Sequence, residues 1–135
     1  MKESAFQFND PSLTRLSFIE NNEFVIEKGK DIEIQTSINV SNTRISENEA
    51  IVVLTIQLGD KETKAPFFLE TEFVAKFTWV SGLSDSQVGS FLNQNAPALL
   101  LSYSRPIIAM VTNASRYPAY NIPFINFVQE KRMSD

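Results

Sequence analysis

The first 80 residues alternate apolar with polar side chains, which is the pattern of strands that bury one face. The alternating segments are residues 5–8 with 16–18, 31–44, 50–58 and 66–80. Asp10-Pro11 interrupts the first of them and predicts a bulge or turn inside one long strand. Because short turns separate the segments, the pattern predicts a four-stranded antiparallel sheet, arranged as a meander, in about residues 3–80.

The segment 66–80 divides its residues between two faces most clearly. The apolar face carries Phe67, Leu69, Thr71, Phe73, Ala75, Phe77 and Trp79. The opposite face carries Glu70 and Glu72, and residues 1–83 hold thirteen acidic against eight basic side chains. We therefore expect one buried face and one wet, acidic face.

The second half of the chain has the pattern of helices. Ser84 and Gln87 form a capping box that opens a short helix to about Asn93, and Pro97 suits the first turn of a longer helix to about residue 115. These helices and a loop occupy about residues 84–130 of a single domain that spans residues 1–135. Residues 86–129 contain only two charged side chains, so the sheet, a partner chain or a bound protein must cover much of this surface.

Composition removes several classes of function. The chain has no Cys and no His, which excludes disulfides, imidazole bases and most zinc sites, and we predict no catalytic residue, metal or cofactor. Glu70 and Glu72 could form a carboxylate pair, but strand spacing also places solvated acids there. A pI near 4.9 argues against a nucleic-acid partner. The absence of a long apolar run argues against membrane insertion and favours a cytoplasmic protein.

The aromatic side chains are the best candidates for a binding site. A segment punctuated by proline follows the long helix, and its rings could line an apolar groove or could only pack the helix onto the sheet. The opposite wall would come from the end of the first strand and the connection after it. The candidate groove residues are Phe18, Phe24, Tyr117, Tyr120, Phe124 and Phe127.

The region from Pro97 to Phe127 resembles the SecB family of protein-export chaperones. That family has a signature close to Pro-Asn-x-Leu-Phe-Pro-Tyr-Ala-Arg, followed by Phe-Pro, Leu-Asn-Leu and Asn-Phe. The matching positions here are Pro97, Leu100, Tyr103, Arg105, Tyr117-Pro118, Asn121-Ile122 and Asn126-Phe127. Leu16-Ser17-Phe18 and Leu69-Glu70 resemble strand positions of the same family.

The resemblance implies an α+β fold in which helices pack on one side of the sheet, assembled as a homotetramer that is a dimer of dimers. It implies an ATP-independent holdase that keeps unfolded preproteins in apolar grooves for translocation and passes them to the SecA motor. Glu70, with Glu72 beside it, would belong to a motor-docking face. Tyr103 and Arg105 would have structural roles in the oligomer.

Three departures leave other functions open. Ser102 precedes Tyr103 where the family has proline, Pro106 follows Arg105, and the chain ends eight residues after Phe127, so we expect a shorter groove wall. A dedicated interaction protein, such as the chaperone of an antitoxin, is the alternative function. A small-ligand carrier would use the same groove.

Overall fold

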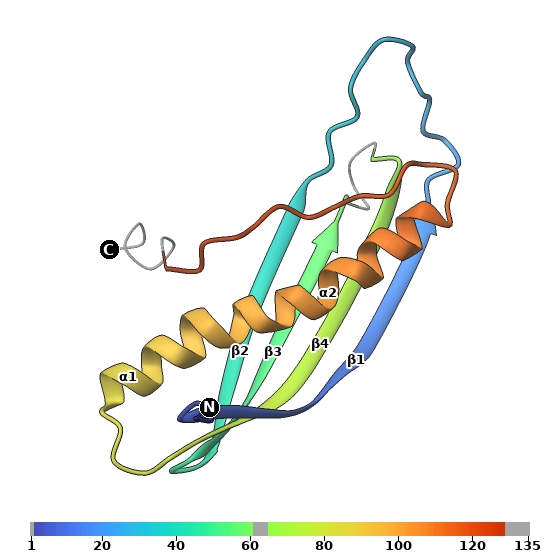
Figure 1. Cartoon of the computed structure of the whole chain (residues 1–135). Helices are drawn as coiled ribbons and strands as arrows, with labels where there is room; N and C mark the ends of the chain where they lie inside the picture. The colour runs from blue at the N-terminus through green and yellow to red at the C-terminus, as the bar shows by residue number, and fades with distance from the viewer. Residues whose placement is uncertain (1, 61–64, 129–135) are drawn as a thin grey trace.

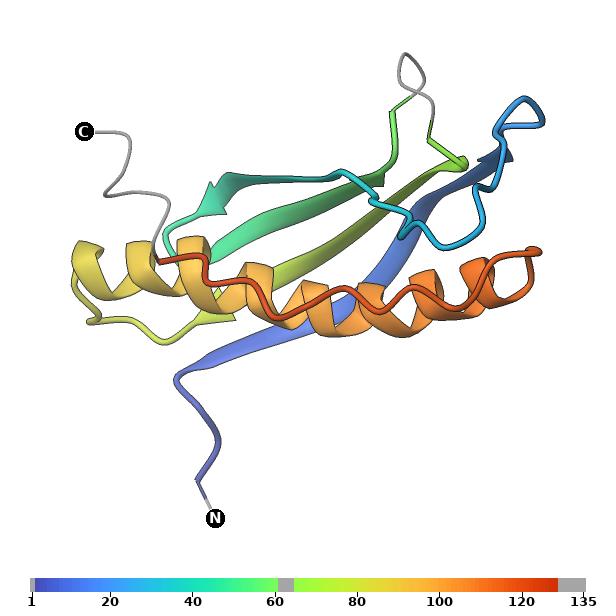
Figure 2. The ribbon, with the colours of Figure 1, turned by 90° about the horizontal axis from the view of Figure 1, so that it is seen from above.

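The computed structural model describes residues 2–60 and 65–128, which form two layers. One layer is an antiparallel sheet, and a helix followed by an extended segment covers one face of it (Figures 1 and 2). The elements are β1 (Phe6–Glu20), β2 (Thr36–Ser46), β3 (Glu49–Leu58), β4 (Phe67–Trp79), α1 (Asp85–Ser90), the π-helix η1 (Phe91–Asn95) and α2 (Ala96–Asn113). The α+β class with a four-stranded sheet is as the sequence predicted, and residues 129 and 130 of the expected loop region lie outside the described residues.

The strand order is β1-β4-β3-β2, so the meander prediction is wrong for the first strand. Only β2, β3 and β4 follow one another, while β1 pairs with β4. Residues 21–35 carry the chain from one edge of the sheet to the other (Figure 1). As a result, β2 is an edge strand, and this order decides where the candidate site lies.

The second strand also begins later than the alternation indicated, at Thr36 rather than residue 31. Its partner is β3, which ends at Leu58, and Leu58 lies opposite Thr36. The chain turns at Gly59, whose φ is 76°, so residues 31–34 have no strand beside them. Ile32 and Ile34 continue the alternation, but alternation alone forms no ladder.

The predicted interruption of the first strand is a bulge. Asp10 has a φ of 50°, and the pairing with β4 shifts between Asn9 and Ser12. A second shift follows between Leu13 and Arg15. The two irregularities bend β1, and Figure 2 shows the strand crossing the line of α2.

The core lies between the inner face of β3 and β4 and the helix layer. Every second residue of both strands is buried, and the β4 residues that the sequence assigned to the apolar face are all among them. Leu100 and Ile108 of α2 are fully buried against this face. Each such aliphatic side chain contributes roughly 1.5 to 3 kcal/mol to folding.

The helix layer is continuous where the sequence predicted two helices with a restart near residue 95. The capping box is present: Ser84 Oγ accepts from the Gln87 N–H at 3.1 Å, and Gln87 Oε1 accepts from the Ser84 N–H at 2.9 Å. The wider π-turn η1 then precedes Pro97. Because proline has no N–H and crowds the preceding turn, the wider turn lets the helix pass Pro97 without a break.

After α2 the chain runs back along it as an extended segment, residues 114–128, which we call the strap (Figure 2). Ile122 is fully buried and anchors the strap. Arg105 Nε donates to the Ile122 carbonyl at 2.9 Å, and the guanidinium lies 4.8 Å from the centre of the Phe124 ring. The hydrogen-bond partner of Arg105 is thus a carbonyl of the strap in the same chain.

We predict that Arg105→Ala lowers the melting temperature by roughly 3 to 6 °C, because a charge-assisted hydrogen bond contributes about 1 to 2 kcal/mol. Arg44→Ala is the matched control: Arg44 also stacks on a ring, that of Trp79 at 5.1 Å, but is exposed on the edge strand. Differential scanning calorimetry on both variants checks this. Equal losses in the two variants would contradict a specific role for the Arg105–Ile122 bond.

Candidate functional site

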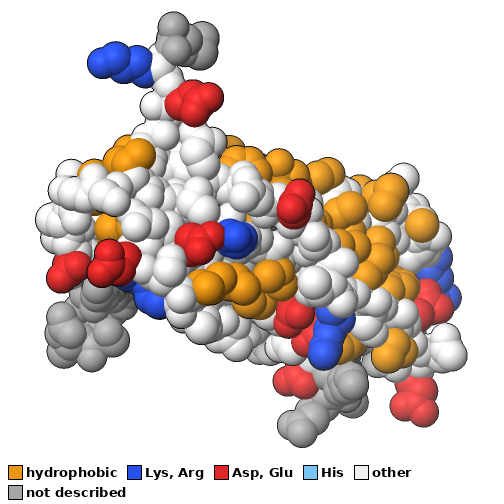
Figure 3. Space-filling view, turned by 90° about the horizontal axis from the view of Figure 1, so that it is seen from below, with side chains coloured by type: hydrophobic (Ala, Val, Ile, Leu, Met, Phe, Trp, Pro, Cys, Tyr) orange, Lys and Arg blue, Asp and Glu red, His pale blue; other side chains and the backbone are white. Residues whose placement is uncertain are grey.

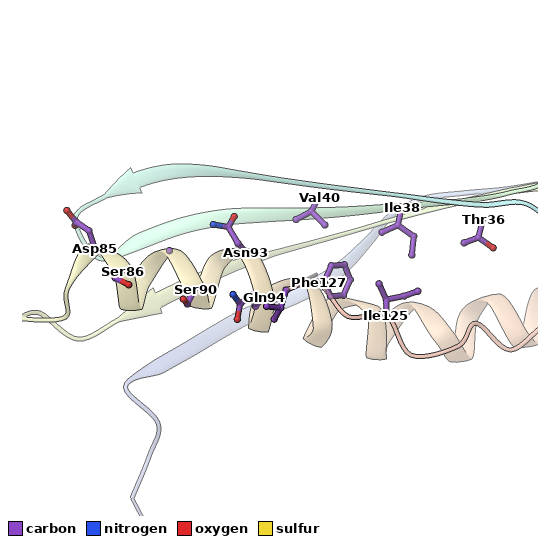
Figure 4. Close-up of a pocket in the computed structure, with 12 residues that line it drawn as sticks. Thr36, Ile38, Val40, Asp85, Ser86, Ser90, Asn93, Gln94, Ile125 and Phe127 are labelled. Atoms are coloured by element: carbon purple, nitrogen blue, oxygen red, sulfur yellow. The ribbon is translucent and has the colours of Figure 1, made fainter. Parts of the chain in front are cut away.

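A groove of about 930 Å³ runs between the edge strand β2 and the helix layer. One wall is the inner face of β2, and the other is α1 with η1 and the end of the strap. The lining residues are Thr36, Ile38, Val40, Asp85, Ser86, Gly89, Ser90, Asn93, Gln94, Ile125, Phe127 and Val128. Figure 4 shows Ile38 and Val40 pointing from β2 toward Ile125 and Phe127.

The groove is nearly free of charge. Among the described residues that line it, Asp85, at the start of α1, is the one ionisable side chain. The strand and the strap supply aliphatic and aromatic groups, whereas the helix supplies the amides of Asn93 and Gln94. Such a surface can bury apolar side chains and can hydrogen-bond a polypeptide backbone, but it offers nothing to a strongly charged ligand.

Gly89 leaves the helical wall open at its centre. A Cβ added at this position would meet no heavy atom within 4 Å, because the glycine faces the empty groove rather than the core. Glycine makes a helix less stable than alanine would, by about 1 kcal/mol. At this position the missing side chain leaves the groove wider.

The six aromatic residues that the sequence proposed do not form one surface. Phe18, Phe24 and Tyr117 gather around Phe67 near the ends of β1 and α2, with ring centroids 5.3 to 6.4 Å apart. Tyr117 is buried, and its hydroxyl has no hydrogen-bond partner among the described residues. This cluster is part of the packing between strap and sheet, which was the alternative interpretation.

The other three candidates take separate positions along the strap. Phe127 lines the groove. Tyr120 is half-buried: its N–H donates to Thr112 Oγ1 at 2.8 Å, and its hydroxyl lies 3.4 Å from Thr36 Oγ1 at one end of the groove. Phe124 is 87% exposed, and its ring lies against the guanidinium group of Arg105.

The sequence missed the β2 wall and the polar helical wall of this groove. Its alternation did place Ile38 and Val40 on one face, but in a meander β2 would lie inside the sheet with its inner face covered. The signal that could have found the groove is the long connection 21–35, which is long enough to carry the chain across the sheet.

A second pocket of about 1130 Å³ lies under the connection 21–35. Its floor is apolar and includes Phe24, Phe67 and Phe68. The described residues of its lining also include one base, Lys30, and the acidic residues Glu20, Glu23, Glu27, Asp31, Glu33 and Asp60. Glu20 and Glu27 are paired with Arg116 and Lys30, at 2.9 and 2.7 Å.

The outer face of the sheet carries the acids that the resemblance assigned to docking. Glu70 pairs with Arg15 at 3.2 Å and accepts a hydrogen bond from Gln57, while Glu72 Oε1 accepts from Thr14 Oγ1 at 2.8 Å. Further along, a hydrogen bond from Lys76 at 2.7 Å holds the pKa of the Glu49 carboxyl below its usual value. The expected acidic face is therefore crossed by ion pairs.

An apolar surface lies on the opposite side of the helix layer from the groove. Leu13 and Leu16 of β1 and Tyr103 and Met110 of α2 are 37 to 62% exposed. Tyr103 packs against the Phe8 and Phe73 rings, both at 6.2 Å. Seen from below, where β1 and α2 lie, hydrophobic side chains gather into a broad band (Figure 3). The exposed positions of α2 carry no charge.

The described residues hold neither a cluster of metal ligands nor a membrane-spanning helix. No group of three or more acidic side chains there is arranged to hold a metal ion. Within the same residues, no helix has both the length and the apolar content to cross a bilayer.

The chain has relatives of known name. "Protein-export protein SecB" of Hahella chejuensis is 28% identical over 93% of this chain and 80% of its own length. The protein of the same name from Marinobacter nauticus is 27% identical over 79% of this chain and 65% of its own length. The chain thus spans four fifths of the first relative and just under two thirds of the second.

The fold has a solved counterpart as well. The SecB-like chaperone Rv1957 of Mycobacterium tuberculosis, in complex with a ChAD peptide from the HigA1 antitoxin, superimposes with a TM-score of 0.72. The likeness covers 90% of this chain and 91% of that chain at 13% sequence identity. It confirms the predicted fold.

The family model of the preprotein translocase subunit SecB matches residues 2–131. This match extends well beyond the region from Pro97 to Phe127 that carried the resemblance, and it confirms that resemblance. The family consists of chaperones, not enzymes, in keeping with the lack of a predicted catalytic residue. The chain belongs to the SecB family of protein-export chaperones.

Proposed function

We propose that this protein is an ATP-independent holdase that binds unfolded or precursor polypeptides in the groove between β2 and the helix layer. The observation that carries the proposal is the nearly uncharged, open groove of about 930 Å³ with Ile38 and Val40 on one wall and Phe127 on the other. Unfolded chains expose apolar side chains at many points, and this lining accepts them with little regard to sequence. The expected compartment is the cytoplasm, where precursors await export.

Because the groove is open, the free energy of client binding would be the sum of several weak contacts. An apolar client side chain that is fully buried contributes roughly 1.5 to 3 kcal/mol, and the ordering of the client opposes this gain. The second pocket, under the connection 21–35 and with Phe24 in its lining, would serve as a second contact for a longer client. Tyr120 and Phe124 lie on the strap between the two.

We predict that Gly89→Trp weakens the binding of an unfolded client at least tenfold, because the indole would fill the centre of the groove. The space at Gly89 is open, so the fold should survive. Gly89→Ala is the matched control, since it also replaces the glycine by a better helix former but adds little volume. Fluorescence anisotropy with a labelled, reduced and unfolded client protein measures both affinities. Unchanged affinity in Gly89→Trp would contradict the proposed site.

We also propose that the chain assembles through the apolar surface formed by Leu13, Leu16, Tyr103 and Met110. An uncharged, exposed helix face beside exposed strand leucines is unusual for a monomer. A second copy on this surface would place the α2 helices between two sheets. In a dimer of dimers, this apolar surface would be covered in all four copies. The groove lies on the other side of the helix layer and stays open.

Leu16→Glu should disrupt the assembly and give particles near 15.3 kDa, while the wild type should be larger. The buried charge would lack a partner at the interface. Ile45→Glu is the control, because Ile45 is 52% exposed on β2, away from this surface. Multi-angle light scattering at micromolar concentration measures the mass. A monomeric wild type, or equal effects of both substitutions, would overturn the assembly model.

SecA is the proposed recipient of the client, with the outer face around Glu70 and Glu72 as its docking surface. Glu72 is hydrogen-bonded only by a neutral hydroxyl among the contacts described above, and it can exchange that contact for a cationic group of a partner. Glu70 already has Arg15 beside it, so docking there requires that pair to rearrange.

The variant Glu70→Gln with Glu72→Gln should lower affinity for SecA about tenfold or more, because two acceptors lose their charge. Glu49→Gln is the control on the same face, where Lys76 already neutralises the acid. Isothermal titration calorimetry with purified SecA provides the comparison. Loss of affinity in the control alone would place docking elsewhere on the sheet.

A dedicated partner is the second candidate function. The solved SecB-like counterpart is in complex with a peptide from an antitoxin, which supports a dedicated partner as a candidate for this chain. Protection of several unrelated unfolded proteins from aggregation would support the general holdase. A single copurifying partner, with no general protection, would support the dedicated chaperone.

A further inference from the structure

We propose that the chain covers part of its own groove: residues 129–135, which follow the strap, lie on the helical wall until a client displaces them. This inference rests on the proposed holdase function and concerns its regulation. The occupant is Gln-Glu-Lys-Arg-Met-Ser-Asp, which comes directly after Val128 in the sequence. The evidence is the division of the groove lining, one unpaired acid on the helical wall, and the place to which the strap brings the chain.

The two walls of the groove differ in chemistry. Figure 4 shows Ile38 and Val40 of β2 across from Phe127, which gives one apolar part of the lining. The helical wall is polar along its length, and its side chains are Asp85, Ser86, Ser90, Asn93 and Gln94. Apolar client side chains gain free energy against the first part only. The helical wall therefore suits a polar segment better than it suits a client.

Asp85 gives this wall its charge. Its side chain is exposed in the first turn of α1 and forms no ion pair with any residue that the structure describes. Lys131 and Arg132, two adjacent bases, follow Val128 closely in the sequence. An exposed ion pair is weak by itself, but a base on the same chain acts at an effective concentration in the millimolar range. The tethered bases are thus well placed to pair with Asp85.

The strap brings the chain within reach of Asp85. Val128 and Gln94 both line the groove, and the Val128 N–H donates to Asn126 Oδ1 at 3.0 Å. The helical path from Gln94 back to Asp85 is about 14 Å, at roughly 1.5 Å per residue. The three or four residues from Val128 to the two bases span about 10 to 14 Å when extended, at roughly 3.3 Å each. The bases can therefore reach the acid.

The second pocket carries more acids, but the strap leads away from it. Arg116, near the start of the strap, pairs with Glu20 in the lining of that pocket, whereas Val128 lines the groove. A second copy of the chain could also supply the bases. At micromolar protein concentration, however, the tethered segment has an advantage of about a thousandfold over a segment from another copy. The segment of the same chain is therefore the occupant that we favour.

This contact would make client binding a competition. Both walls border one groove, so a chain on the helical wall narrows the space that is left for another. A client with several apolar side chains displaces the segment, because its contacts add together, whereas a poor client does not. The segment would thus raise the threshold for binding without closing the site.

The first test uses introduced cysteines, because the chain has none of its own. Ser86→Cys with Met133→Cys keeps Asp85 and both bases, and Thr43→Cys with Met133→Cys is the control. Thr43 is also exposed but points to the outer face of β2. Oxidised glutathione forms the disulfides, and a non-reducing gel follows them. Each rate is divided by the rate at which a thiol reagent labels the same cysteine, since a thiol near a helix start ionises more readily.

We expect the Ser86 pair to form its disulfide within one chain at least fivefold faster than the Thr43 pair. An excess of unfolded client protein should slow the Ser86 pair and leave the control unchanged. Equal rates in the two pairs, or disulfides that join only different chains, would overturn the proposal.

The second test reverses the charges. Lys131→Glu with Arg132→Glu should raise the affinity for the unfolded client about threefold, because the segment leaves the wall. Adding Asp85→Lys should return the affinity to within about 1.5-fold of wild type, since the ion pair is restored with opposite signs. Unchanged affinity in the first variant, or no return in the second, would overturn the contact with Asp85.

The two tests also separate this inference from the proposed function. If the wild type bound no unfolded client while the Ser86 disulfide still formed preferentially, the holdase function would fail and the contact of the segment with the helical wall would stand. If clients bound and Gly89→Trp weakened them, but the disulfide showed no preference, the client site would stand and the self-covering segment would be wrong.

Discussion

The width of one helix set against four strands is the constraint on which the rest of this structure depends. A helix with its side chains is about 10 Å across, and strands lie about 4.8 Å apart, so one helix covers two strands and no more. Here α2 packs on β3 and β4, whose inner faces are buried along their whole length. The inner faces of β1 and β2 are covered only in part on either side: Phe8 still packs on Tyr103, and Ile38 is half-buried beside the groove. The surface proposed for assembly lies along the β1 side of the helix, and the groove proposed for client binding lies along the β2 side. We call these two sides the margins.

The two margins differ in chemistry because different segments approach them. On the β1 side, α2 offers Tyr103 and Met110 to exposed leucines, and the result is a surface suited to a folded partner of fixed shape. On the β2 side, Gly89 leaves the helical wall without a side chain, and the strap adds Phe127 to the lining of the groove. That margin is hollow rather than flat. Arg105 contributes to both, since it extends from the helix of the first margin to anchor the strap that completes the second.

The local pattern of side chains in the sequence predicted most of the helices and strands, but it did not predict the order of the strands in the sheet. Alternation located all four strands and both faces of β4, and Ser84 with Gln87 located the helix start. Alternation reports which face of a strand is buried but not which strand is its neighbour, so the place of β1 beside β4 was missed. The groove was missed for the same reason, because β2 becomes an edge only in the observed order. Of the candidate aromatics, Phe127 alone lines the groove, while Tyr117 is packing.

A holdase has to distinguish unfolded from folded proteins without reading a particular sequence, and the groove proposed above suits this task. Unfolded chains expose apolar side chains that folding buries, so a lining of aliphatic and aromatic groups with few charges favours the unfolded form. Because each such contact contributes little free energy by itself, a groove of this kind can release its client when folding or a translocation motor competes for the same side chains.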